Sequence, residues 1–357
     1  MKSENTFLYK SINTKKKNKI LLLLGMSPLR VGFAGGGTDL EEYHNKYEGA
    51  TISATIDKFT YVFARLRNDK KLQSFSPDFA SHLPPKTFSK IAPPQGHEIV
   101  LSCLKEMKFS KGIDMFFCSD VSPGSGLGAS GAMACNIVEV LLKLQNKKLS
   151  KKTIALKAYG IGHDVLKWKI GKQDEFGATF GGFNLCTWNK NKVDVKQLSL
   201  NKNFLKELEQ NSMLFNIGYR GHSSKILEKQ VVNIKKSAKA PLEALHRQKE
   251  IALEIANSLK KNDLTEFTEL LKEGWEQKKK NANGITNRTI EQICKISFLN
   301  GANALKVTGA GGGGHMYLIA KPSRHKKIEK ALQRLGVKKV PFNFTDQGTR
   351  QIELNHI

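Results

Sequence analysis

The sequence predicts a protein of mixed α and β structure with room for two domains. The chain has 357 residues, and ordinary domains hold roughly 100–200 residues each. Segments rich in strand formers alternate with segments whose apolar residues recur at helical spacing. Apolar residues make up 39% of the chain, enough for a sizeable core, yet no apolar run approaches the roughly 18 residues that cross a membrane.

The N-terminal part is predicted to consist of strands that follow a short extension. Residues 1–19 form a basic segment that we expect to be disordered. Residues 20–66 are rich in strand formers broken by glycine, which predicts two or more strands. The proline-rich residues 68–95 are predicted to form a loop.

The middle of the chain shows the order strand, glycine loop, helix. Residues 115–118 predict a short apolar strand that runs into the glycine-rich residues 122–131, and residues 132–144 then show helical spacing. Further along, the pattern predicts a helix over residues 151–169, strand structure over residues 176–188 and a polar connection between domains over residues 190–204.

The C-terminal part is predicted to be helical first and mixed afterwards. Residues 222–282 contain long stretches of amphipathic helical spacing. Residues 304–308 predict a strand that enters a second glycine-rich loop, and residues 316–320 predict the strand that leaves it. Residues 323–335 predict the last helix.

The charge of the chain allows two interpretations. Lys and Arg number 58 against 32 Asp and Glu, so the net charge is +26. The lysines are spread along the whole chain, and no zinc module, RNA-binding signature or arginine-aromatic patch accompanies them. We therefore expect a solvated basic surface that attracts anionic substrates rather than a nucleic-acid-binding protein. The five cysteines are odd in number and form no CxxC pair, which favours a reduced, cytoplasmic location.

The first glycine loop has the chemistry of an anion site. Glycines at 124, 126 and 128 leave room for backbone N–H groups to converge on an anion, and the N-terminus of the following helix faces the same place. Ser130 is placed to cap that helix and to reach a phosphate-bound Mg²⁺. The spacing is neither that of the P-loop nor GxGxxG. The alternative is a helix entry in which the glycines serve packing alone.

The second glycine loop has five glycines among the six residues 309–314. Glycine costs backbone entropy on folding, so such a run needs a reason. Close approach of the backbone to a ligand is one reason, and a flexible linker is the alternative. Predicted strands on both sides argue against the linker.

Two further segments carry charged groups beside glycines. Arg30 precedes the run Gly35–Asp39, in which Asp39 could accept hydrogen bonds from two sugar hydroxyls while Arg30 binds a phosphate or the reacting oxygen. The segment Gly171–Glu175 contains Asp174, a candidate base. Taken singly, an Asp in a glycine-containing turn is more often a cap.

Together these four features resemble the GHMP kinase superfamily, and within it the branch of D-glycero-D-manno-heptose 7-phosphate kinases. The motifs that carry the resemblance are Pro28–Leu40, Pro123–Ser130, Gly171–Asp174 with Phe180–Asn184, and Gly309–Gly314. The likeness runs from about Ile20 to the C-terminus, and fucokinase-like enzymes share part of it.

The resemblance implies a two-domain α+β fold with the ligands in the cleft between the domains. An N-terminal domain over residues 20–195, similar to domain 2 of ribosomal protein S5, would carry the nucleotide and substrate loops. A ferredoxin-like C-terminal domain would span residues 205–357. The implied reaction transfers the γ-phosphoryl group of ATP to the anomeric hydroxyl of a sugar phosphate, converting the heptose 7-phosphate to the 1,7-bisphosphate for nucleotide-activated heptose and surface polysaccharide.

The resemblance also assigns roles to individual residues. Asp174 would act as the base and Arg30 would stabilise the transferring group. The nucleotide would be held by Pro123, Gly124, Ser125, Gly126, Leu127, Gly128, Ala129 and Ser130, the acceptor by Gly37, Thr38, Asp39, Gly309, Gly311 and Gly312, and Mg²⁺ by Ser130 and Asp164.

Several positions depart from the family pattern. Gly162 stands where the family places a glutamate on the helix before the base, and Asp164 follows two residues later. Ala129 replaces a serine-type residue, and Glu175 replaces the glutamine after the base.

Three alternatives remain: a fucokinase-like enzyme, a homologue that binds nucleotide or sugar phosphate with weak or no turnover, and, least favoured, a nucleic-acid-binding protein. A homodimer is possible, and no membrane partner is expected.

Overall fold

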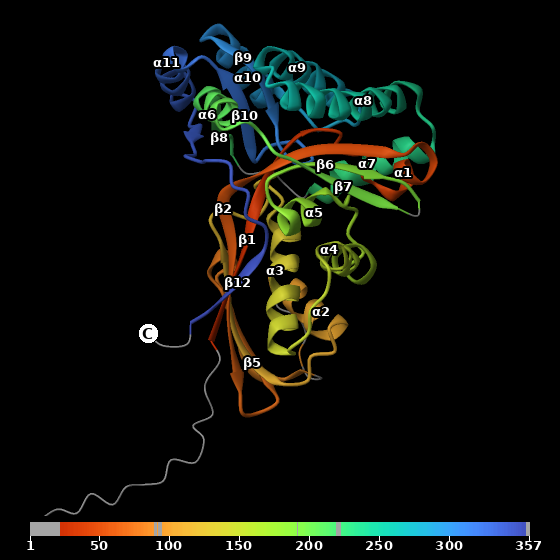
Figure 1. The fold of residues 1–357 in the computed structure, drawn as a ribbon, viewed down its shortest axis with the longest axis vertical. Coiled ribbons are helices and arrows are strands. Elements are labelled where there is room, and N and C mark those ends of the chain that lie inside the picture. The colour runs from red at the N-terminus through yellow and green to blue at the C-terminus, as the bar shows by residue number, and fades with distance from the viewer. Residues whose placement is uncertain (1–21, 89–90, 92–94, 191, 219–222, 355–357) are drawn as a thin grey trace, which may run out of the picture.

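The computed structural model describes residues 22–88, 91, 95–190, 192–218 and 223–354. The extension predicted for residues 1–19 lies outside these ranges. Two β-sheets organise the described chain, one in the long lower part of the molecule and one in the upper part (Figure 1). None of the described helices is long and apolar enough to cross a membrane.

The N-terminal sheet is built around one long strand. Six of its strands follow the order β12 (Arg350–Glu353), β1 (Leu22–Ala34), β2 (Gly49–Arg67), β5 (Gly112–Ser119), β3 (Lys71–Ser76) and β4 (Ser81–Thr87). The first part of β2 pairs with β6 (Phe183–Trp188), which in turn pairs with β7 (Val193–Leu198). The later part of β2 pairs with β5. Because β2 serves both pairings, it links the lower sheet to the layer beneath the upper domain.

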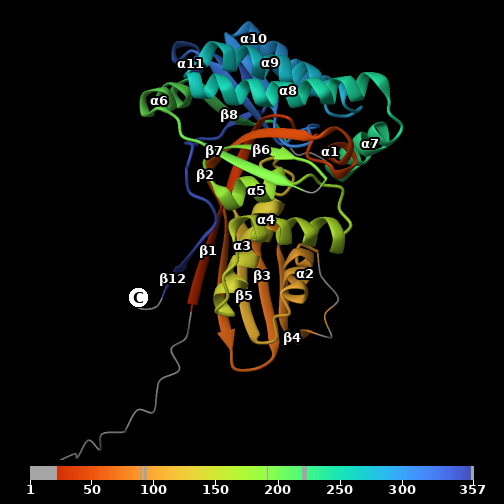
Figure 2. The same cartoon turned by 45° about the vertical axis from the view of Figure 1, so that its right-hand side comes forward.

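Helices cover one face of the N-terminal sheet and leave the other face open (Figures 1 and 2). The covering helices are α2 (Glu98–Glu106), α3 (Ala129–Leu144), α4 (Lys151–Gly160) and α5 (Gln173–Phe180). Twelve of the sixteen residues of α3 are buried, so α3 is the central helix of this layer.

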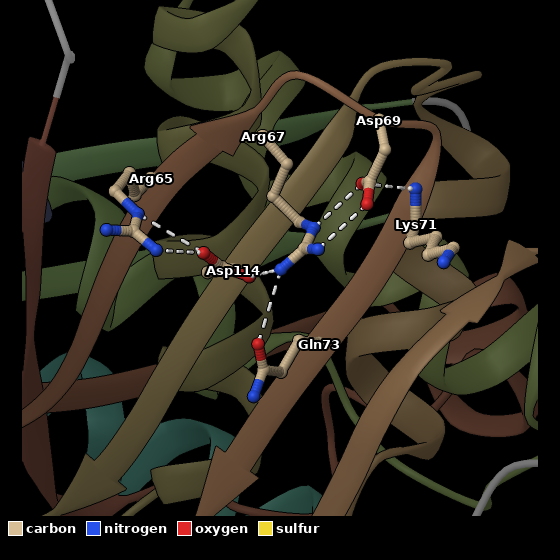
Figure 3. A network of polar contacts seen from close by, with 6 residues as sticks. All are labelled: Arg65, Arg67, Asp69, Lys71, Gln73 and Asp114. Atoms are coloured by element: carbon tan, nitrogen blue, oxygen red, sulfur yellow. Dashed lines mark hydrogen bonds and ion pairs between the residues drawn. The ribbon is translucent and has the colours of Figure 1, made fainter.

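The open face carries a network of charged side chains at the end of the sheet far from the upper domain (Figure 3). Arg67 on β2 donates two hydrogen bonds of 2.8 Å to Asp69 and a third, of 2.6 Å, to Asp114 on β5. Arg65 donates to the other oxygen of Asp114 at 2.6 Å. This network joins three segments of the sheet where no helix supports them.

The C-terminal sheet is antiparallel, in the order β11 (Lys338–Lys339), β8 (Ser212–Asn216), β10 (His315–Ala320) and β9 (Ala302–Val307). The helices of this part are α6 (Lys202–Asn211), α7 (Ser223–Lys235), α8 (Lys239–Lys261), α9 (Leu264–Lys280), α10 (Arg288–Leu299) and α11 (Pro322–Gln333). The short α1 (Glu41–Tyr47) lies between β1 and β2 in sequence and contacts α7.

One apolar core joins the two sheets. Phe33 of β1 packs against Phe267 of α9 and Tyr317 of β10, with ring centroids 5.2 and 5.5 Å apart. Ile251 of α8 belongs to the same buried cluster. The contact is continuous, so the two halves are held in a fixed relation around the residues between them.

The end of the chain returns to the N-terminal sheet. After β11 the chain bridges Ile56 with Phe344, and β12 then pairs antiparallel with β1. The backbone N–H and the hydroxyl of Thr349 both donate to the carbonyl oxygen of Ala178 in α5. The predicted C-terminal domain, residues 205–357, thus contributes a strand to the sheet of the predicted N-terminal domain, residues 20–195. The N-terminal sheet is therefore built from both ends of the chain.

Most predicted elements are confirmed. The helix predicted over residues 132–144 lies within α3, residues 222–282 form α7 to α9, and residues 323–335 correspond to α11. The strands predicted at residues 304–308 and 316–320 are β9 and β10.

Four local predictions are wrong, each for a physical reason. The loop predicted over residues 68–95 contains β3 and β4; β4 is an edge strand and so tolerates its two prolines. The connection predicted over residues 190–204 contains β7 and the start of α6. The strand predicted over residues 176–188 is confirmed in its second part as β6, but its first part belongs to helix α5, which ends at Phe180 with Gly181, at φ 72°, as its C-cap. The helix predicted over 151–169 becomes a π-helical turn at Ile161–Val165.

Candidate active site

A cavity opens where the two glycine loops, the end of β1 and the start of α5 meet. Of the predicted site residues, it is lined by Arg30, Gly37, Asp39, Pro123, Gly124, Ser125, Gly126, Gly128, Ala129, Ser130, Asp174 and Gly309. The predicted residues Thr38, Leu127, Asp164, Gly311 and Gly312 do not line it. The structure therefore brings together residues that lie far apart in the sequence, and it leaves five of the predicted ones outside.

The first glycine loop leads from β5 into α3, and its glycines leave the backbone without covering side chains. Gly124, Gly126 and Gly128 have φ between 77° and 79°, the left-handed region that favours glycine. A Cβ at Gly126 would lie 2.8 Å from the carbonyl oxygen of Thr308, the residue before the second glycine loop. The N-terminus of α3 follows directly, so its free N–H groups and its positive dipole end lie at the cavity.

Ser130 is the second residue of α3, and the N-cap is Gly128. No side chain caps this helix, so the capping role predicted for Ser130 is wrong. Its side chain is exposed and lines the cavity instead.

Arg30 joins the first glycine loop to Asp174. The guanidinium donates from Nη1 to the carbonyl oxygen of Gly126 at 2.7 Å. Its Nε and Nη2 donate to Oδ1 of Asp174 at 2.9 and 2.5 Å. The Arg30 side chain is 3% exposed and that of Asp174 is 28% exposed, so the arginine is the more deeply buried member of the pair. Oδ2 of Asp174 accepts no hydrogen bond from a described residue.

Asp174 and its neighbours need small residues opposite them. A Cβ at Gly128 would lie 3.2 Å from Cγ of Asp174, and one at Gly131 would lie 2.8 Å from its Cβ. The close packing of α3 against α5 thus depends on these two glycines. It fixes the Asp174 carboxylate beside the N-terminus of α3.

Asp39 is a second carboxylate of the cavity and is almost fully buried. Its Oδ1 accepts from the backbone N–H of Gly37 at 2.9 Å, and its Oδ2 accepts from the backbone N–H and side-chain amide of Gln173 at 3.1 and 3.2 Å. Burial raises the pKa of Asp39, although the hydrogen bonds to Gly37 and Gln173 oppose this. Gln173, the residue directly before Asp174, therefore ties the loop Gly35–Asp39 to the start of α5.

Thr38 has a structural part in the same loop. Its hydroxyl lies within 3.1 Å of three backbone groups, the carbonyl oxygens of Gly35 and Ala50 and the N–H of Ala50. The side chain is fully buried. With its hydrogen-bonding capacity used, the hydroxyl holds the turn shut and is not available to a ligand.

The second glycine loop packs against the first. A Cβ at Gly314 would lie 2.4 Å from the carbonyl oxygen of Ser125. His315, directly after the run, points Nδ1 at the same oxygen at 2.9 Å. Gly311 and Gly312 instead pack on Ile285, whose carbonyl oxygen accepts from the N–H of Gly312 at 2.7 Å. Close backbone packing thus explains several of these glycines.

Sequence analysis missed Lys278, a cation of the cavity wall. Its amine donates to the carbonyl oxygen of Gly309, and the residue is 5% exposed. Leu271 and Trp275 lie seven and three residues earlier on the buried side of α9, and this spacing could have placed Lys278 on the same side. Lys306 is a second buried lysine, and it donates to the carbonyl oxygen of Phe33 at 2.7 Å. Burial, then Lys278 and Arg30, lower its pKa well below the usual value.

Glu175 lies beside Asp174 and is 3% exposed. Its Oε2 has no hydrogen-bond partner, and the side chain lines the cavity. Burial, and next the charge of Asp174, raise the pKa of Glu175 well above its usual value. Burial thus favours the neutral form of this side chain, which resembles the glutamine of the family pattern in shape.

The two residues predicted to hold Mg²⁺ are not brought together. The Asp164 side chain is 71% exposed and accepts from Nδ1 of its neighbour His163 at 2.7 Å. Asp164 lies in the π-helical turn, outside the cavity, while Gly162 faces inward. A Cβ at Gly162 would lie 2.7 Å from Ile170, so the local packing is adapted to glycine. Within the described ranges, no three His, Cys, Asp or Glu residues cluster as a metal site.

Comparison with known proteins identifies the fold around this cavity. Residues 97–182 match the GHMP kinases N terminal domain, and residues 255–338 match the GHMP kinases C terminal domain. D-glycero-alpha-D-manno-heptose 7-phosphate kinase of Campylobacter jejuni is 31% identical, over 91% of this chain and 97% of that protein. L-fucokinase/L-fucose-1-P guanylyltransferase of Bacteroides fragilis is 23% identical, over 87% of this chain and 36% of that protein.

Solved structures agree with the sequence relatives. A D-glycero-D-manno-heptose 1-phosphate kinase from Bacteroides thetaiotaomicron superposes with a TM-score of 0.77 at 26% identity, covering 93% of this chain and 99% of that one. Lactococcus lactis galactokinase, complexed with galactose, superposes with a TM-score of 0.74 at 18% identity, which shows likeness of fold alone. The chain is thus a kinase with a two-domain α+β fold. It belongs to the GHMP kinase family.

Proposed function

We propose that the protein transfers the γ-phosphoryl group of ATP to the anomeric hydroxyl of a sugar phosphate, D-glycero-D-manno-heptose 7-phosphate. The observation that carries the proposal is the Arg30–Asp174 pair, held against the first glycine loop in a cavity that also contains Asp39. The 31% identity to the heptose 7-phosphate kinase supports the choice of acceptor. The product would feed nucleotide-activated heptose synthesis in the cytoplasm.

The first glycine loop fits a triphosphate. Its left-handed glycines free the backbone N–H groups, and the N-terminus of α3 favours negative charge at the same place. ATP supplies the phosphoryl group when it is bound, and accompanying Mg²⁺ supplies charge neutralisation. Ser130 offers the one hydroxyl at the start of α3 that faces the cavity, which fits a cation whose other ligands are phosphate oxygens and waters.

Asp174 is proposed to receive the proton of the acceptor hydroxyl. Its Oδ2 is the oxygen left for that hydroxyl, because Oδ1 takes both bonds from Arg30. Arg30 orients the carboxylate and brings positive charge beside the transferring group. Such positioning and charge neutralisation are most of what phosphoryl transfer requires.

Asp39 and Gly37 are proposed to hold the acceptor. The Asp39 carboxylate is fixed by the backbone of its own loop and by Gln173, so it is rigid before a sugar arrives. A fixed acceptor group binds hydroxyls with little loss of entropy. Gly309 completes the wall from the second glycine loop.

The test is ADP release from ATP and Mg²⁺ with a panel of acceptors: the heptose 7-phosphate, the heptose 1-phosphate, mannose 6-phosphate, L-fucose, galactose and mevalonate. We expect turnover with the heptose 7-phosphate and a loss of roughly 10²–10⁴-fold in kcat for Asp174→Ala. Asp194→Ala is the matched control, since it removes an exposed carboxylate of a surface ion pair on β7. Turnover with L-fucose alone would replace the acceptor and keep the reaction.

A second candidate function rests on Gly162. A glycine that lines the cavity at the family's glutamate position removes a carboxylate ligand, which would suit a protein that binds nucleotide or sugar phosphate with little turnover. That function predicts a rise in Tm with ATP and no ADP release with any acceptor of the panel.

A further inference from the structure

Two buried amide side chains beside the Gly35–Asp39 loop carry polar atoms that have no hydrogen-bond partner among the described residues. Gln230, on α7, is 2% exposed, and its carbonyl oxygen Oε1 has no partner. Asn281, just after α9, is 1% exposed, and neither Oδ1 nor Nδ2 has a partner. Nothing in the proposed chemistry uses either residue.

Both amides lie at the same glycine. A Cβ at Gly37 would lie 3.0 Å from Oε1 of Gln230 and 3.8 Å from Nδ2 of Asn281. Gln230 also lines the cavity that contains Asp39 and Asp174. Gln230 therefore lines the cavity, and its Oε1 is buried against Gly37 in the same loop as Asp39.

The surroundings hold Gln230 in this place. Val231 and Ile234 of α7 pack with Leu40 and Tyr43, which follow Asp39 directly in the chain. Helix α7 is thus anchored, by apolar residues that follow Gln230, to the segment that follows the Gly35–Asp39 loop. The amide keeps its position relative to Asp39 because one small core carries both.

A buried carbonyl oxygen without a donor destabilises the free protein, so a core position occupied by glutamine needs a compensating partner. Another buried glutamine shows the ordinary pattern. Gln248 accepts from the N–H of Gly35 at 3.1 Å and donates to the carbonyl oxygen of Gly274. Gln230 lines the cavity, and no described residue donates a hydrogen bond to its Oε1.

We propose that Gln230 is a specificity-determining residue whose side-chain amide forms a hydrogen bond with one hydroxyl of the acceptor. The inference rests on the proposed function, since it takes the acceptor to be a polyhydroxylated sugar phosphate. Asp39 binds hydroxyls on the side of β1, and the amide of Gln230 binds one on the side of α7. A ligand with hydroxyls on both edges satisfies both, which disfavours acceptors that carry a hydroxyl on one edge only.

The experiment compares the wild-type protein with Gln230→Met, which keeps the length of the side chain and removes the amide. We expect kcat/KM for the acceptor to fall roughly 5- to 100-fold, while KM for ATP stays unchanged. The Tm of the free variant should equal or exceed that of the wild type, because an unsatisfied buried oxygen is gone. A merely structural glutamine would instead lower Tm.

Monodeoxy acceptors identify the hydroxyl. For one of them, wild type and Gln230→Met should have the same kcat/KM, because the group that Gln230 recognises is missing from the sugar. Val232→Ala, an exposed position on the same helix, is the matched control and should behave as the wild type with every acceptor.

The outcomes separate the two proposals. If the wild type turns over any sugar of the panel and Gln230→Met has the same kcat/KM for it, the role of Gln230 is overturned and the kinase function stands. A uniform loss with every deoxy acceptor also overturns it. If the wild type turns over no sugar, both proposals are overturned.

Discussion

At the scale of single residues, Glu175 is a buried acid whose cost to stability depends on pH. Its pKa in the folded protein lies well above the value of 4.5 that an unburied Glu has, because of burial and of Asp174 beside it. The folded state therefore binds more protons than the unfolded state at pH above about 4.5, and the free energy of unfolding falls as pH rises through that range.

Glu175→Gln removes this titration without changing the shape of the side chain. We expect its free energy of unfolding to match that of the wild type near pH 4 and to exceed it increasingly toward pH 8, as measured by urea unfolding. A difference between the two proteins that stays constant with pH would contradict a raised pKa of Glu175 in the folded protein.

Sequence reasoning reached most residues of the cavity and missed those placed by tertiary contacts. Arg30, Asp39 and Asp174 stand in short motifs beside glycines, so they could be found from local chemistry alone. Lys278 and Gln230 lie on helices whose spacing shows burial and not what they face. Thr38 is the opposite case. Its place in a motif predicted that it binds the acceptor, but its hydroxyl donates to backbone carbonyl oxygens of its own turn and of β2.

At the scale of elements, the first glycine loop depends on the contact between its backbone and the second loop. Gly126→Ala places a Cβ 2.8 Å from the Thr308 carbonyl oxygen and forces a left-handed φ on alanine. We expect a loss of about 1–3 kcal/mol in the free energy of unfolding and a rise in KM for ATP.

Gly336→Ala separates the two causes. It has φ 76° but nothing within 4 Å of its Cβ, so it carries the conformational strain without the clash. Equal losses of stability in the two variants, with an unchanged KM for ATP in Gly126→Ala, would show that contact between the loops does not shape the nucleotide site.

The open face of the N-terminal sheet is stabilised by charge where no helix covers it (Figure 3). The Arg67 guanidinium lowers the pKa of Asp69 to about 2, from an ordinary value of 3.8. A carboxyl whose folded pKa is depressed contributes stability above its unfolded pKa, and this contribution is lost as pH falls from about 3.8 to about 2.

The stability difference between wild type and Asp69→Asn should be small and constant above pH 5. It should shrink as pH is lowered from 5 to 3 in urea unfolding. Asp194→Asn, at an exposed surface pair, serves as the control for a general effect of removing one acid. A difference that is unchanged at pH 3 would mean that the Arg67–Asp69 pair does not stabilise the fold.

The elements that sequence reasoning missed are those whose identity depends on their neighbours. Strands β3 and β4 contain or adjoin prolines, and they form because β5 offers an edge for β3 to pair with in parallel. Strand β7 is polar, and among the described strands it pairs with β6 alone. Local propensity is weak in all three, so tertiary pairing decides their structure.

At the scale of the whole molecule, the chain end acts as a strap that holds the helix of the proposed base. Thr349 bonds to Ala178 of α5, and β12 then pairs with β1, which carries Arg30. This long-range pairing has no local signal in the sequence. Residues near the C-terminus thus contact both elements of the Arg30–Asp174 pair, β1 and α5.

Gly348→Ala tests the strap because its Cβ would lie 2.3 Å from the backbone carbonyl oxygen of Thr179, so the strap or the end of α5 must move. A displacement of α5 by a fraction of an ångström misplaces Asp174, and we expect kcat to fall by roughly tenfold at temperatures well below Tm. Asn343→Ala is the control: it removes the bond to Asp57 on β2 and leaves α5 untouched, so it should lower Tm with little change in kcat. If Gly348→Ala lowered Tm and left kcat unchanged, the strap would stabilise the sheet and have no part in positioning the base.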